Sequence, residues 1–401
     1  MDEWIDIFLS DILMDKGYIR GPFGSALKRG DMKEDGIPVY EQQHAIYNSR
    51  DFRYYIDEQK FNEMKRFQVK KDDLIISCSG TVGKVSIIKD DDPKGIISQA
   101  LLLLRADTNK VLPLYLKYFF SSREGYNAIV SRSSGSVQVN IAKRSVIEQI
   151  PLKLPQIKTQ RKIVGVLSSI DEKIEENERI NNNLLEQVLT LYRNKFVDTA
   201  NNERAICRAD EYFDISIGKT PPRKEPQWFS TNPQDVTWVS ISDMGTCGLY
   251  ISSSSEQLTK QAVERHNVKV VPDNTVLLSF KLTIGRIAIT NGEMTTNEAI
   301  AHFKTDKKEI NEYLYCYLKC FNYQTMGSTS SIATAVNSKI IKGMPFVVPT
   351  NDELEEFHGF AAPMFAKIKA NQIETDNLTA IRDTLLPKLM SGELDVSDIK
   401  L

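Results

Sequence analysis

The chain of 401 residues carries 51 Lys and Arg against 53 Asp and Glu, a net charge of −2, and 41% of its residues are hydrophobic. This is ordinary globular usage, which excludes a wholly disordered or collagen-like chain, and the length predicts two or three domains. No apolar run approaches the roughly 18 residues of a membrane span. The first residues lack the pattern of a signal peptide. The five cysteines form no CxxC pair, as in reducing compartments. We therefore expect a soluble cytoplasmic protein.

Charge is unevenly distributed along the sequence. Residues 1–155 contain 23 Lys and Arg against 21 Asp and Glu, and residues 200–349 contain 16 against 15. The acidity lies in residues 350–401, with 5 basic and 10 acidic side chains. A nucleic-acid binder is usually basic. Composition alone therefore neither requires nor excludes DNA as a partner.

An internal repeat is the most informative feature of the sequence. The segment TVGKV at 81–85 matches TIGRI at 283–287. The segment 139–155 matches 333–349, and both end in a proline pair. These matches indicate two diverged copies of about 200 residues each, far longer than the repeats of a solenoid.

Each copy begins with a block of about 150 residues that contains short β-branched runs separated by Gly and Pro. In chain order, the expected strands cover 74–77 and 85–88 in the first copy, and 275–278 and 286–289 in the second. Amphipathic helices are expected over 112–121 and 310–321. The pattern predicts α/β (α+β) blocks with a mixed sheet, each closed by its proline pair.

A long polar-rich helix is predicted after each block, because apolar residues recur every 3.5 positions, as in a coiled coil. Asn177 and Asn181 occupy seam positions in the first helix, where a polar side chain costs stability but can fix the register. The predicted seam consists of Ile163, Leu167, Ile170, Ile174, Leu184, Val188 and Leu191 in the first helix, and Leu354, Phe357, Ile368, Leu378 and Leu385 in the second.

The second long helix has recognisable ends. Thr350, followed by two early acids, predicts its N-cap, and Gly392 predicts its C-cap. Pro363 predicts a kink or a later start. One interpretation is that each helix packs only on its own block. The other, which we favour, is that the two helices pack antiparallel as a spacer, because 40 helical residues span about 60 Å.

The sequence contains none of the common motifs of catalytic or metal sites for which we searched. The four histidines form no metal-binding motif, and a Walker loop fails because Cys78 replaces its first glycine and Val85 its Ser or Thr. No GxSxG nucleophile elbow or dinucleotide fingerprint occurs. We therefore expect a chain that catalyses no reaction and binds no metal.

The glycine turns and several polar loops are candidate DNA contacts, because hydroxyl, amide and cationic groups suit phosphates and base edges. Each of them could also be an ordinary solvated loop. Their recurrence at corresponding points of both copies favours a function. The candidates are Lys28, Arg29, Gln42, Gln43, Thr81 and Lys84 in the first copy, and Lys219, Arg223, Lys224, Ser240, Asp243, Thr283 and Arg286 in the second.

These motifs together resemble the DNA-specificity subunit of type I restriction-modification systems, over essentially the whole chain. The resemblance rests on TVGKV and TIGRI, on 140–156 before the coiled-coil helix, on Ile174-Glu-Glu-Asn177, and on TLLPKLMSGEL at 384–394. The second copy departs from the pattern at Thr334-Ala335, where the first has Asn140-Ile141. Recognition contacts there need not correspond between the copies.

The resemblance implies target recognition domains at 1–155 and 200–349, a central spacer helix at 156–199, and a C-terminal spacer helix and tail at 350–401. It implies a pseudo-twofold arrangement in which each domain reads half of a split double-stranded DNA target. It also implies docking of modification subunits, two of them expected, and of motor-nuclease subunits. S-adenosylmethionine, ATP and Mg would then belong to those partners, and no membrane is involved.

Two other functions stay open from the sequence. One is a two-domain module that binds protein or carbohydrate, against which the absence of a signal peptide and the basic loops argue. The other is an enzyme with an unrecognised site at the domain junction, against which the absence of a titratable cluster argues. Cleaving between the copies separates these hypotheses, since a specificity subunit should keep its half-site binding.

Overall fold

The computed structural model describes residues 4–23, 26–133, 139–198, 204–326, 336–397 and 399. It contains two compact units, which we call unit 1 (Met1–Lys173 with Leu378–Leu401) and unit 2 (Ile174–Asn377). The two long helices, α6 (Ile157–Tyr192) and α12 (Asn351–Ser391), each have one end in either unit. The domain edges at 155, 199 and 349, which set the helices apart as spacers, stay a prediction.

Unit 1 is built on a four-stranded sheet of order β2-β8-β5-β6 and a three-stranded sheet of order β4-β3-β7. A short antiparallel pair, β1 with β9, closes the block next to the start of α6. The elements are β1 (Ile5–Phe8), β2 (Leu13–Arg20), β3 (Ile37–Tyr40), α1 (Gln42–Tyr47), β4 (Tyr55–Ile56), α2 (Glu58–Glu63), β5 (Leu74–Ser77), β6 (Val85–Ile87), β7 (Ile96–Ile97), β8 (Leu101–Ala106), α3 (Pro113–Ser121), α4 (Arg123–Val130), α5 (Arg144–Ile147) and β9 (Pro151–Leu154).

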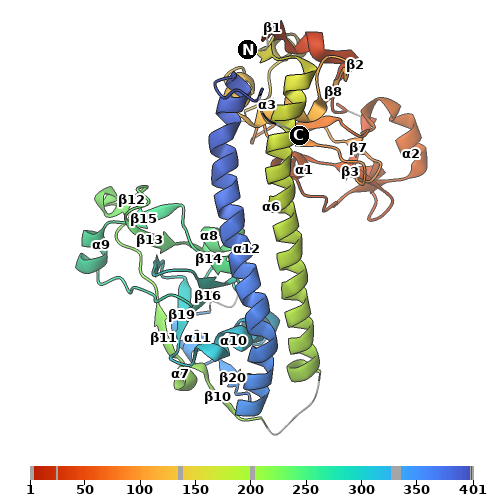
Figure 1. Ribbon diagram of the computed structural model, residues 1–401. Coiled ribbons are helices and arrows are strands. Elements are labelled where there is room, and N and C mark those ends of the chain that lie inside the picture. Colours follow the sequence, from red (N-terminus) through yellow and green to blue (C-terminus); the bar gives the residue numbers. More distant parts are fainter. Residues whose placement is uncertain are drawn as a thin grey trace. The chain divides into compact units, whose positions relative to one another are not determined.

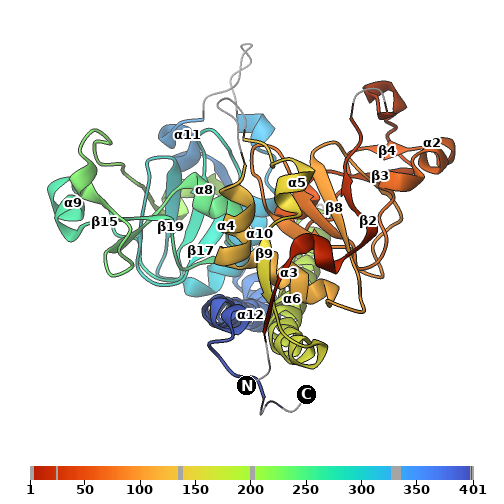
Figure 2. The same ribbon diagram turned by 90° about the horizontal axis from the view of Figure 1, so that it is seen from above.

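The four-stranded sheet of unit 1 is buried on both faces. Leu102 and Leu104 of β8 belong to the core that includes α3, whereas Leu101 and Leu103 belong to a second core on the opposite face. Figure 2 shows this layering, with α3 on one side of β8 and β3, β4 and α2 on the other. Burial on both faces explains why residues 101–104 of β8 form a continuous apolar run and do not alternate between apolar and polar residues.

Unit 2 repeats this plan with a five-stranded sheet of order β11-β19-β16-β17-β14 and a four-stranded sheet of order β12-β15-β13-β18. The pair β10 with β20 closes it, as β1 with β9 closes unit 1. The elements are β10 (Ile206–Arg208), α7 (Ala209–Tyr212), β11 (Asp214–Ile217), β12 (Phe229–Ser230), β13 (Val236–Val239), α8 (Ile241–Thr246), β14 (Tyr250–Ile251), β15 (Glu256–Leu258), α9 (Lys260–Arg265), β16 (Val276–Ser279), β17 (Ile287–Thr290), β18 (Thr295–Thr296), β19 (Ile300–Lys304), α10 (Asn311–Cys320), α11 (Ser338–Lys342) and β20 (Pro345–Val347).

The central sheet of unit 2 is also buried on both faces. Val276 and Leu278 of β16 pack into the core that contains α10, while Leu277 between them packs into the core on the α8 side. Figure 1 shows α10 and β20 beside the start of α12. The predicted strands and helices of both copies are confirmed within one or two residues at each end. Most strand pairs are antiparallel, and one parallel pair makes the expected mixed sheet in the three-stranded sheet of unit 1 and in each of the two larger sheets of unit 2. The four-stranded sheet of unit 1 is wholly antiparallel, so the prediction of a mixed sheet is wrong there.

The long helices pair antiparallel within unit 2. Asn177 donates from Nδ2 to Glu374 Oε2 at 2.9 Å, and Asn371 donates from Nδ2 to Asn181 Oδ1 at 2.8 Å. The side chains of Asn177 and Asn371 are almost fully buried. The two asparagines that interrupt the predicted seam therefore lie in the seam and form a polar layer across it.

The predicted seam positions differ in how deeply they are buried. Seven of them are buried, namely Ile163, Leu167, Ile174, Val188, Leu354, Phe357 and Ile368. The other five are half-buried, namely Ile170, Leu184, Leu191, Leu378 and Leu385. In unit 1, Ile163 and Leu167 share a core with Leu389 of α12 and with Leu152 of the globular block. The helices thus pack on each other and on their block at once, so the two interpretations are not exclusive.

The ends of α12 agree with its capping residues. Glu353 N donates to Thr350 Oγ1 at 3.2 Å, and Thr350 N donates to Glu353 Oε2 at 2.9 Å, which is a reciprocal capping box. The helix ends at Ser391, and Gly392 has a φ of +76°. The later start suggested by Pro363 is wrong, because the helix begins at Asn351 and continues through that proline.

Candidate nucleic-acid interface

The two glycine turns have the same hydrogen bonds. In unit 1, Ser77 O accepts from Gly83 N at 2.9 Å, and Ser77 Oγ accepts from Lys84 N at 3.0 Å. In unit 2, Ser279 O accepts from Gly285 N at 3.1 Å, and Ser279 Oγ accepts from Arg286 N at 3.1 Å. The turns connect β5 to β6 and β16 to β17, so the strands predicted on either side of each glycine turn pair as an antiparallel hairpin.

Each turn is backed by a tyrosine ring. The glycines have φ values of +86° at Gly83 and +88° at Gly285, a region that favours glycine. A Cβ at Gly83 would lie 3.3 Å from Tyr126 Cε2, and one at Gly285 would lie 3.2 Å from Tyr323 Cε2. Both the backbone conformation and the close ring therefore require glycine. The tyrosines were not among the sequence candidates, because they lie far from the turns in sequence.

The basic residue after each glycine is used differently in the two copies. Lys84 is exposed, with its Nζ 5.0 Å from the centre of the Tyr126 ring. Arg286 is half-buried, and its Nη1 donates to Ile241 O at 2.6 Å. Lys84 thus offers an accessible cation, whereas Arg286 holds its turn against the start of α8.

The two glutamines of α1 are half-buried and hydrogen-bonded. Gln42 Oε1 accepts from Ser79 N at 3.1 Å, so Gln42 lies at the foot of the turn that carries Thr81. Gln43 donates from Nε2 to Asp51 O at 3.0 Å. Ser79 Oγ also donates to Asn140 Oδ1 at 2.9 Å. The structure therefore brings Gln42, Thr81 and Lys84 together and adds Ser79, which the sequence analysis missed.

Lys28 and Arg29 are exposed in a loop on the other sheet of unit 1. Leu27 and Met32, which flank them, pack on the core beneath β3, β4 and β7. Asp31 Oδ2 accepts from Lys28 N at 2.7 Å, which shapes this loop. Gly24 and Ser25, which precede Lys28 in the sequence, lie outside the described residues, as do Thr334 and Ala335.

Three candidates of unit 2 lie in the segment before β12, and two of them contact aromatic residues of the smaller sheet or His266. Arg223 forms an ion pair with Glu256 at 2.9 Å, and its guanidinium lies 4.2 Å from the centre of the Phe229 ring. Lys219 Nζ donates to His266 O at 2.5 Å, and Lys224 is exposed. These residues form a basic and aromatic surface separate from the glycine turn.

Ser240 and Asp243 form a capping box at the start of α8. Asp243 Oδ2 accepts from Ser240 N at 2.8 Å and from Ser240 Oγ at 2.7 Å, and Oδ1 accepts from Ser255 N at 3.0 Å. Burial alone would raise the pKa of Asp243, but these hydrogen bonds hold that pKa below its usual range. Their polar groups are therefore occupied in fixing α8, whose first residue, Ile241, is bound by Arg286.

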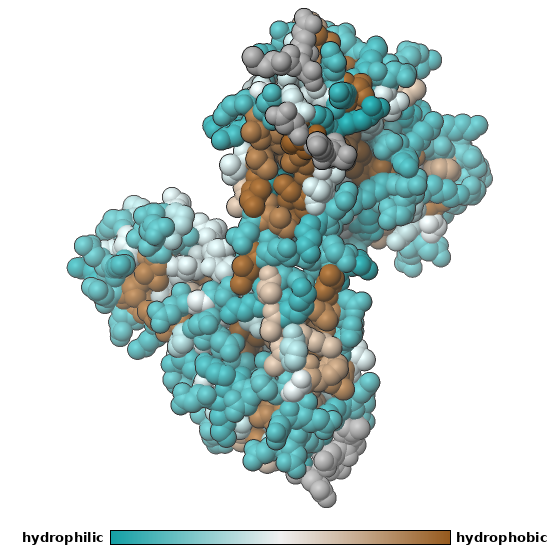
Figure 3. Space-filling view, viewed as in Figure 1, coloured by the Kyte–Doolittle hydropathy of each residue, from teal (hydrophilic) through white to brown (hydrophobic). Residues whose placement is uncertain are grey.

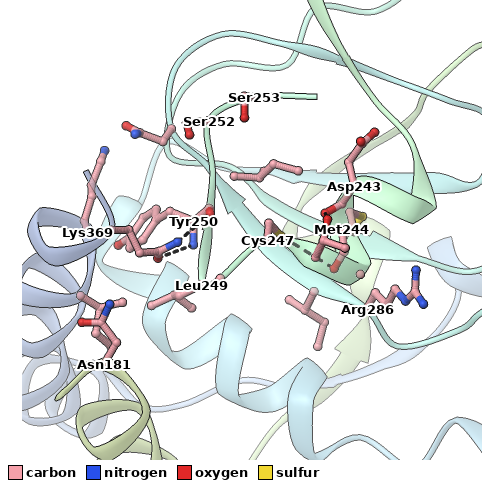
Figure 4. A pocket seen from close by; sticks show the side chains of 18 of the residues that line it. Asn181, Asp243, Met244, Cys247, Leu249, Tyr250, Ser252, Ser253, Arg286 and Lys369 are labelled. Atoms are coloured by element: carbon pink, nitrogen blue, oxygen red, sulfur yellow. Dashed lines mark hydrogen bonds between the residues drawn. The ribbon is translucent and has the colours of Figure 1, made fainter. Parts of the chain in front are cut away.

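A polar cavity of about 970 Å³ lies in unit 2 between α8, the loop after β14 and the helix pair. Figure 4 shows Asp243 and Arg286 on one side and Tyr250 and Lys369 on the other. Gln372 of α12 accepts from Tyr250 N at 3.0 Å and donates to Tyr250 O at 3.1 Å. These bonds tie α12 to the sheet of its own unit.

The buried His302 has a hydrogen-bond partner for each ring nitrogen. His302 is buried between Ser216 Oγ at 3.0 Å and Thr296 Oγ1 at 2.7 Å, and burial lowers its pKa to about 3. Within the described ranges, no three metal-binding side chains gather into a possible ion site. Nor does any described helix combine the length and apolar character that crossing a membrane requires.

Comparisons with known proteins agree with this duplicated fold. The model of the type I restriction modification DNA specificity domain matches residues 6–186 and 205–363. The chain is 22% identical over 405 residues to the specificity subunit of the type I restriction enzyme HindI from Haemophilus influenzae, covering 81% of this chain and 87% of that one. It is 25% identical over 383 residues to the MjaIX specificity subunit from Methanocaldococcus jannaschii, covering 88% and 84%.

The crystal structure of a type I restriction-modification S subunit from M. genitalium has the same fold, with a TM-score of 0.59, 15% identity, and coverage of 97% of this chain and 96% of that one. The family model matches most of the chain and covers a large part of each copy. The protein therefore belongs to the type I restriction-modification DNA specificity family and is a DNA specificity subunit.

Proposed function

We propose that each unit reads one half of a bipartite DNA target and that this chain itself catalyses no reaction. The observation that carries the proposal is the glycine turn, which is built twice with the same backbone hydrogen bonds but with different side chains around it. A shared scaffold with different exposed groups is what two different half-sites require, because base edges are read by side chains.

On this proposal, the accessible groups near the unit 1 turn are Thr81, Lys84 and the free amide of Gln42. In unit 2, the corresponding contacts come from Thr283 and from the basic surface of Lys219, Arg223 and Lys224. Ser240, Asp243 and Arg286 act on DNA indirectly, by positioning α8 and the turn. Phosphate contacts by the cations would set the register, and the uncharged groups would discriminate bases.

We also propose that the long helices set the half-site spacing and dock two modification subunits, with motor-nuclease subunits joining that core. Exposed apolar side chains on these helices support a docking role, among them Phe360 at 42% and Ile373 at 43% exposure in unit 2. Figure 3 shows an apolar surface over the helical parts of unit 1. Ile381 of α12, in the same unit, is 50% exposed. Contiguous exposed apolar patches mark sites of interaction with other proteins.

The partners would supply S-adenosylmethionine, ATP and Mg, and the assembly would work in the cytoplasm on host DNA. The near-neutral recognition blocks imply that partner subunits provide much of the phosphate affinity. We expect the isolated chain to bind duplex DNA weakly and with a steep loss as salt rises. Tight non-specific binding in high salt would contradict this division of labour.

Methylome sequencing of host DNA with and without this chain tests the main proposal. We expect one bipartite adenine-methylation motif to disappear when the chain is absent. Exchanging residues 1–155 for the corresponding block of a subunit with another specificity should change one half-site and leave the other and the spacing intact. An unchanged methylome in a strain that expresses the partner subunits would contradict the proposal.

A further inference from the structure

The tip of the β16–β17 turn carries a leucine in an unfavourable conformation. Leu282 has a φ of +60° and a side chain that is 100% exposed, the highest value among the large hydrophobic residues that the structure describes. The left-handed region brings Cβ of a non-glycine residue close to the neighbouring carbonyl oxygen. Full exposure also forgoes the gain from burying an apolar side chain. Folding of unit 2 therefore does not explain this leucine.

The matching turn of unit 1 shows that the leucine is not needed to build the turn. Gly80 stands at the corresponding position with a φ of +68°, so both copies need a left-handed residue there. A Cβ at Gly80 would meet no other atom within 4 Å. The position is thus open to solvent in unit 1 and in unit 2, and glycine would serve both turns at lower cost.

The neighbours of Leu282 favour a nucleic acid over an apolar protein surface. Lys281 and Thr283 on either side are both exposed, and they offer an ammonium group and a hydroxyl next to the single apolar side chain. The turn belongs to the globular block, whereas the exposed apolar residues Phe360 and Ile373 lie on the long helix α12. A cation and a hydroxyl suit phosphates, and an aliphatic side chain suits the methyl group of thymine in the major groove.

We propose that Leu282 contacts the C5 methyl group of a thymine in the half-site read by unit 2. This rests on the proposed function of the chain and identifies one residue that determines its specificity. It also predicts an asymmetry between the copies, because unit 1 has no side chain at Gly80 to make the same contact. The contact repays the conformational cost of Leu282 only when DNA is bound.

The test uses the complex of this chain with its modification subunits and a duplex that carries its methylation target. Each thymine of the unit 2 half-site is replaced in turn by uracil, which lacks only the methyl group. For the wild type, one replacement should weaken binding about fourfold, the effect of removing one buried methyl group. For Leu282→Gly, the thymine duplex should bind as weakly as that uracil duplex, and the replacement should have no further effect.

Two variants serve as controls. Val270→Ala removes another exposed apolar side chain of unit 2, 48% exposed, and should keep the fourfold sensitivity to uracil. Leu282→Asn introduces a residue type that tolerates the left-handed region. This variant should lose the sensitivity to uracil, as the glycine variant does. In unit 1, Gly80→Leu should create a new uracil sensitivity in the other half-site if a thymine lies beneath the turn.

Several outcomes would overturn the inference. Uracil sensitivity that persists in both Leu282 variants would show that another residue makes the methyl contact. Loss of assembly with the modification subunits, at unchanged uracil sensitivity, would assign Leu282 to a protein interface. A wild-type complex that methylates no bipartite target would instead refute the proposed function, so the two failures are distinguishable.

Discussion

The two units fasten the same three-helix junction by different chemistry. In unit 1, Asp171 of α6 accepts from Lys117 Nζ at 3.2 Å and from Tyr118 Oη at 2.8 Å, both on α3. Arg382 of α12 donates to the same carboxylate at 3.1 Å. One half-buried anion thus joins both long helices to the globular block.

In unit 2, aromatic rings occupy the corresponding junction. Phe357 of α12 lies 6.0 Å from Tyr192 of α6 and 6.3 Å from Tyr313 of α10, measured between ring centres. Phe196, just after α6, lies 5.5 Å from Phe357 and 4.9 Å from Tyr313. Edge-to-face pairs of this kind add stability beyond the area that they bury.

The difference shows which parts of a duplicated fold are free to diverge. The junction needs three elements held together, and either an ion cluster or a ring cluster does so. The glycine turn needs one backbone conformation and space for a ring, so Gly83 and Gly285 stay alike. Backbone requirements are thus retained where packing solutions vary.

The largest effect is expected from Phe357→Ala. The ring is 1% exposed, and removing it should leave a cavity that lowers the free energy of unfolding by about 4 kcal/mol. Urea unfolding of the variant measures this loss. Phe360→Ala, three residues along the same helix and 42% exposed, is the control and should cost less than about 0.5 kcal/mol. Equal losses would mean that the ring cluster is not what holds unit 2.

Asp171→Asn should have the next largest effect. It keeps the shape of the side chain but leaves Lys117 and Arg382 without their shared anion, which we expect to cost about 2 kcal/mol after allowance for solvent screening. The control is Asp383→Asn, because Asp383 binds Arg382 from a 61% exposed position and should matter little. A similar loss in both variants would show that the surface pair contributes as much as the buried one.

The same carboxylate makes unit 1 sensitive to acid. Burial raises the pKa of Asp171, but Lys117, Tyr118 and Arg382 together lower it by more than burial raises it. The pKa therefore lies below the usual 3.8. The stabilisation is therefore fully present above pH 3.8 and is lost as the pH falls through the lower folded value. Urea titrations measure the difference in free energy of unfolding between the wild type and Asp171→Asn. This difference should be constant near neutral pH and should shrink below pH 3.8. A difference that grows on acidification would contradict the assignment.

Gly83→Ala and Gly285→Ala should have smaller and nearly equal effects. Each alanine would adopt an unfavourable φ and press on a tyrosine ring, at a cost of about 1–2 kcal/mol. Thermal unfolding of both variants compares the copies directly. Gly292→Ala is a matched control, with a φ of +96° but no atom near the added Cβ, and it separates backbone strain from ring contact. Clearly unequal losses for the first two would show that the turns are not equivalent.

Asn177→Leu should be stabilising, by about 1 kcal/mol. The Oδ1 atom of Asn177 is buried and has no hydrogen-bond partner among the described residues, so an apolar side chain removes an unmet polar group. Calorimetry should show a higher melting temperature for this variant. Asn183→Leu, at an exposed position of α6, should leave the melting temperature unchanged. A lower melting temperature for Asn177→Leu would mean that the hydrogen bond from the Asn177 amide to Glu374 contributes more stability than the unpaired oxygen costs.

Much of the fold could be predicted from local pattern. The strand 74–77 begins with three apolar residues in a row, and the ends of α12 follow from Thr350 and Gly392. Even the buried asparagines of the seam follow from the 3.5-residue spacing. The aromatic and ionic junctions could not be predicted, because residues 117, 171 and 382 meet only through tertiary packing.

The candidate site was predicted less completely. Gln42, Thr81 and Lys84 do lie together, but Lys28 and Arg29 belong to a loop on another sheet. Ser240 and Asp243 have the spacing of a capping box, and that pattern already indicates that they serve their own helix. The bond from Arg286 to Ile241 joins residues 45 positions apart, and no local pattern reveals it.

The passage of both long helices from one unit to the other has a consequence for folding. Unit 2 is a continuous segment, Ile174–Asn377, and can close its core as soon as that segment has left the ribosome. Unit 1 cannot, since Leu386, Leu389 and Met390 complete the core that Leu9 and Leu167 begin. Until these three residues have been synthesised, the apolar surface of unit 1 stays uncovered. The contacts that then close the core join residues separated by most of the chain, and such long-range contacts form slowly. The half of the protein that is made first is therefore the half that finishes last.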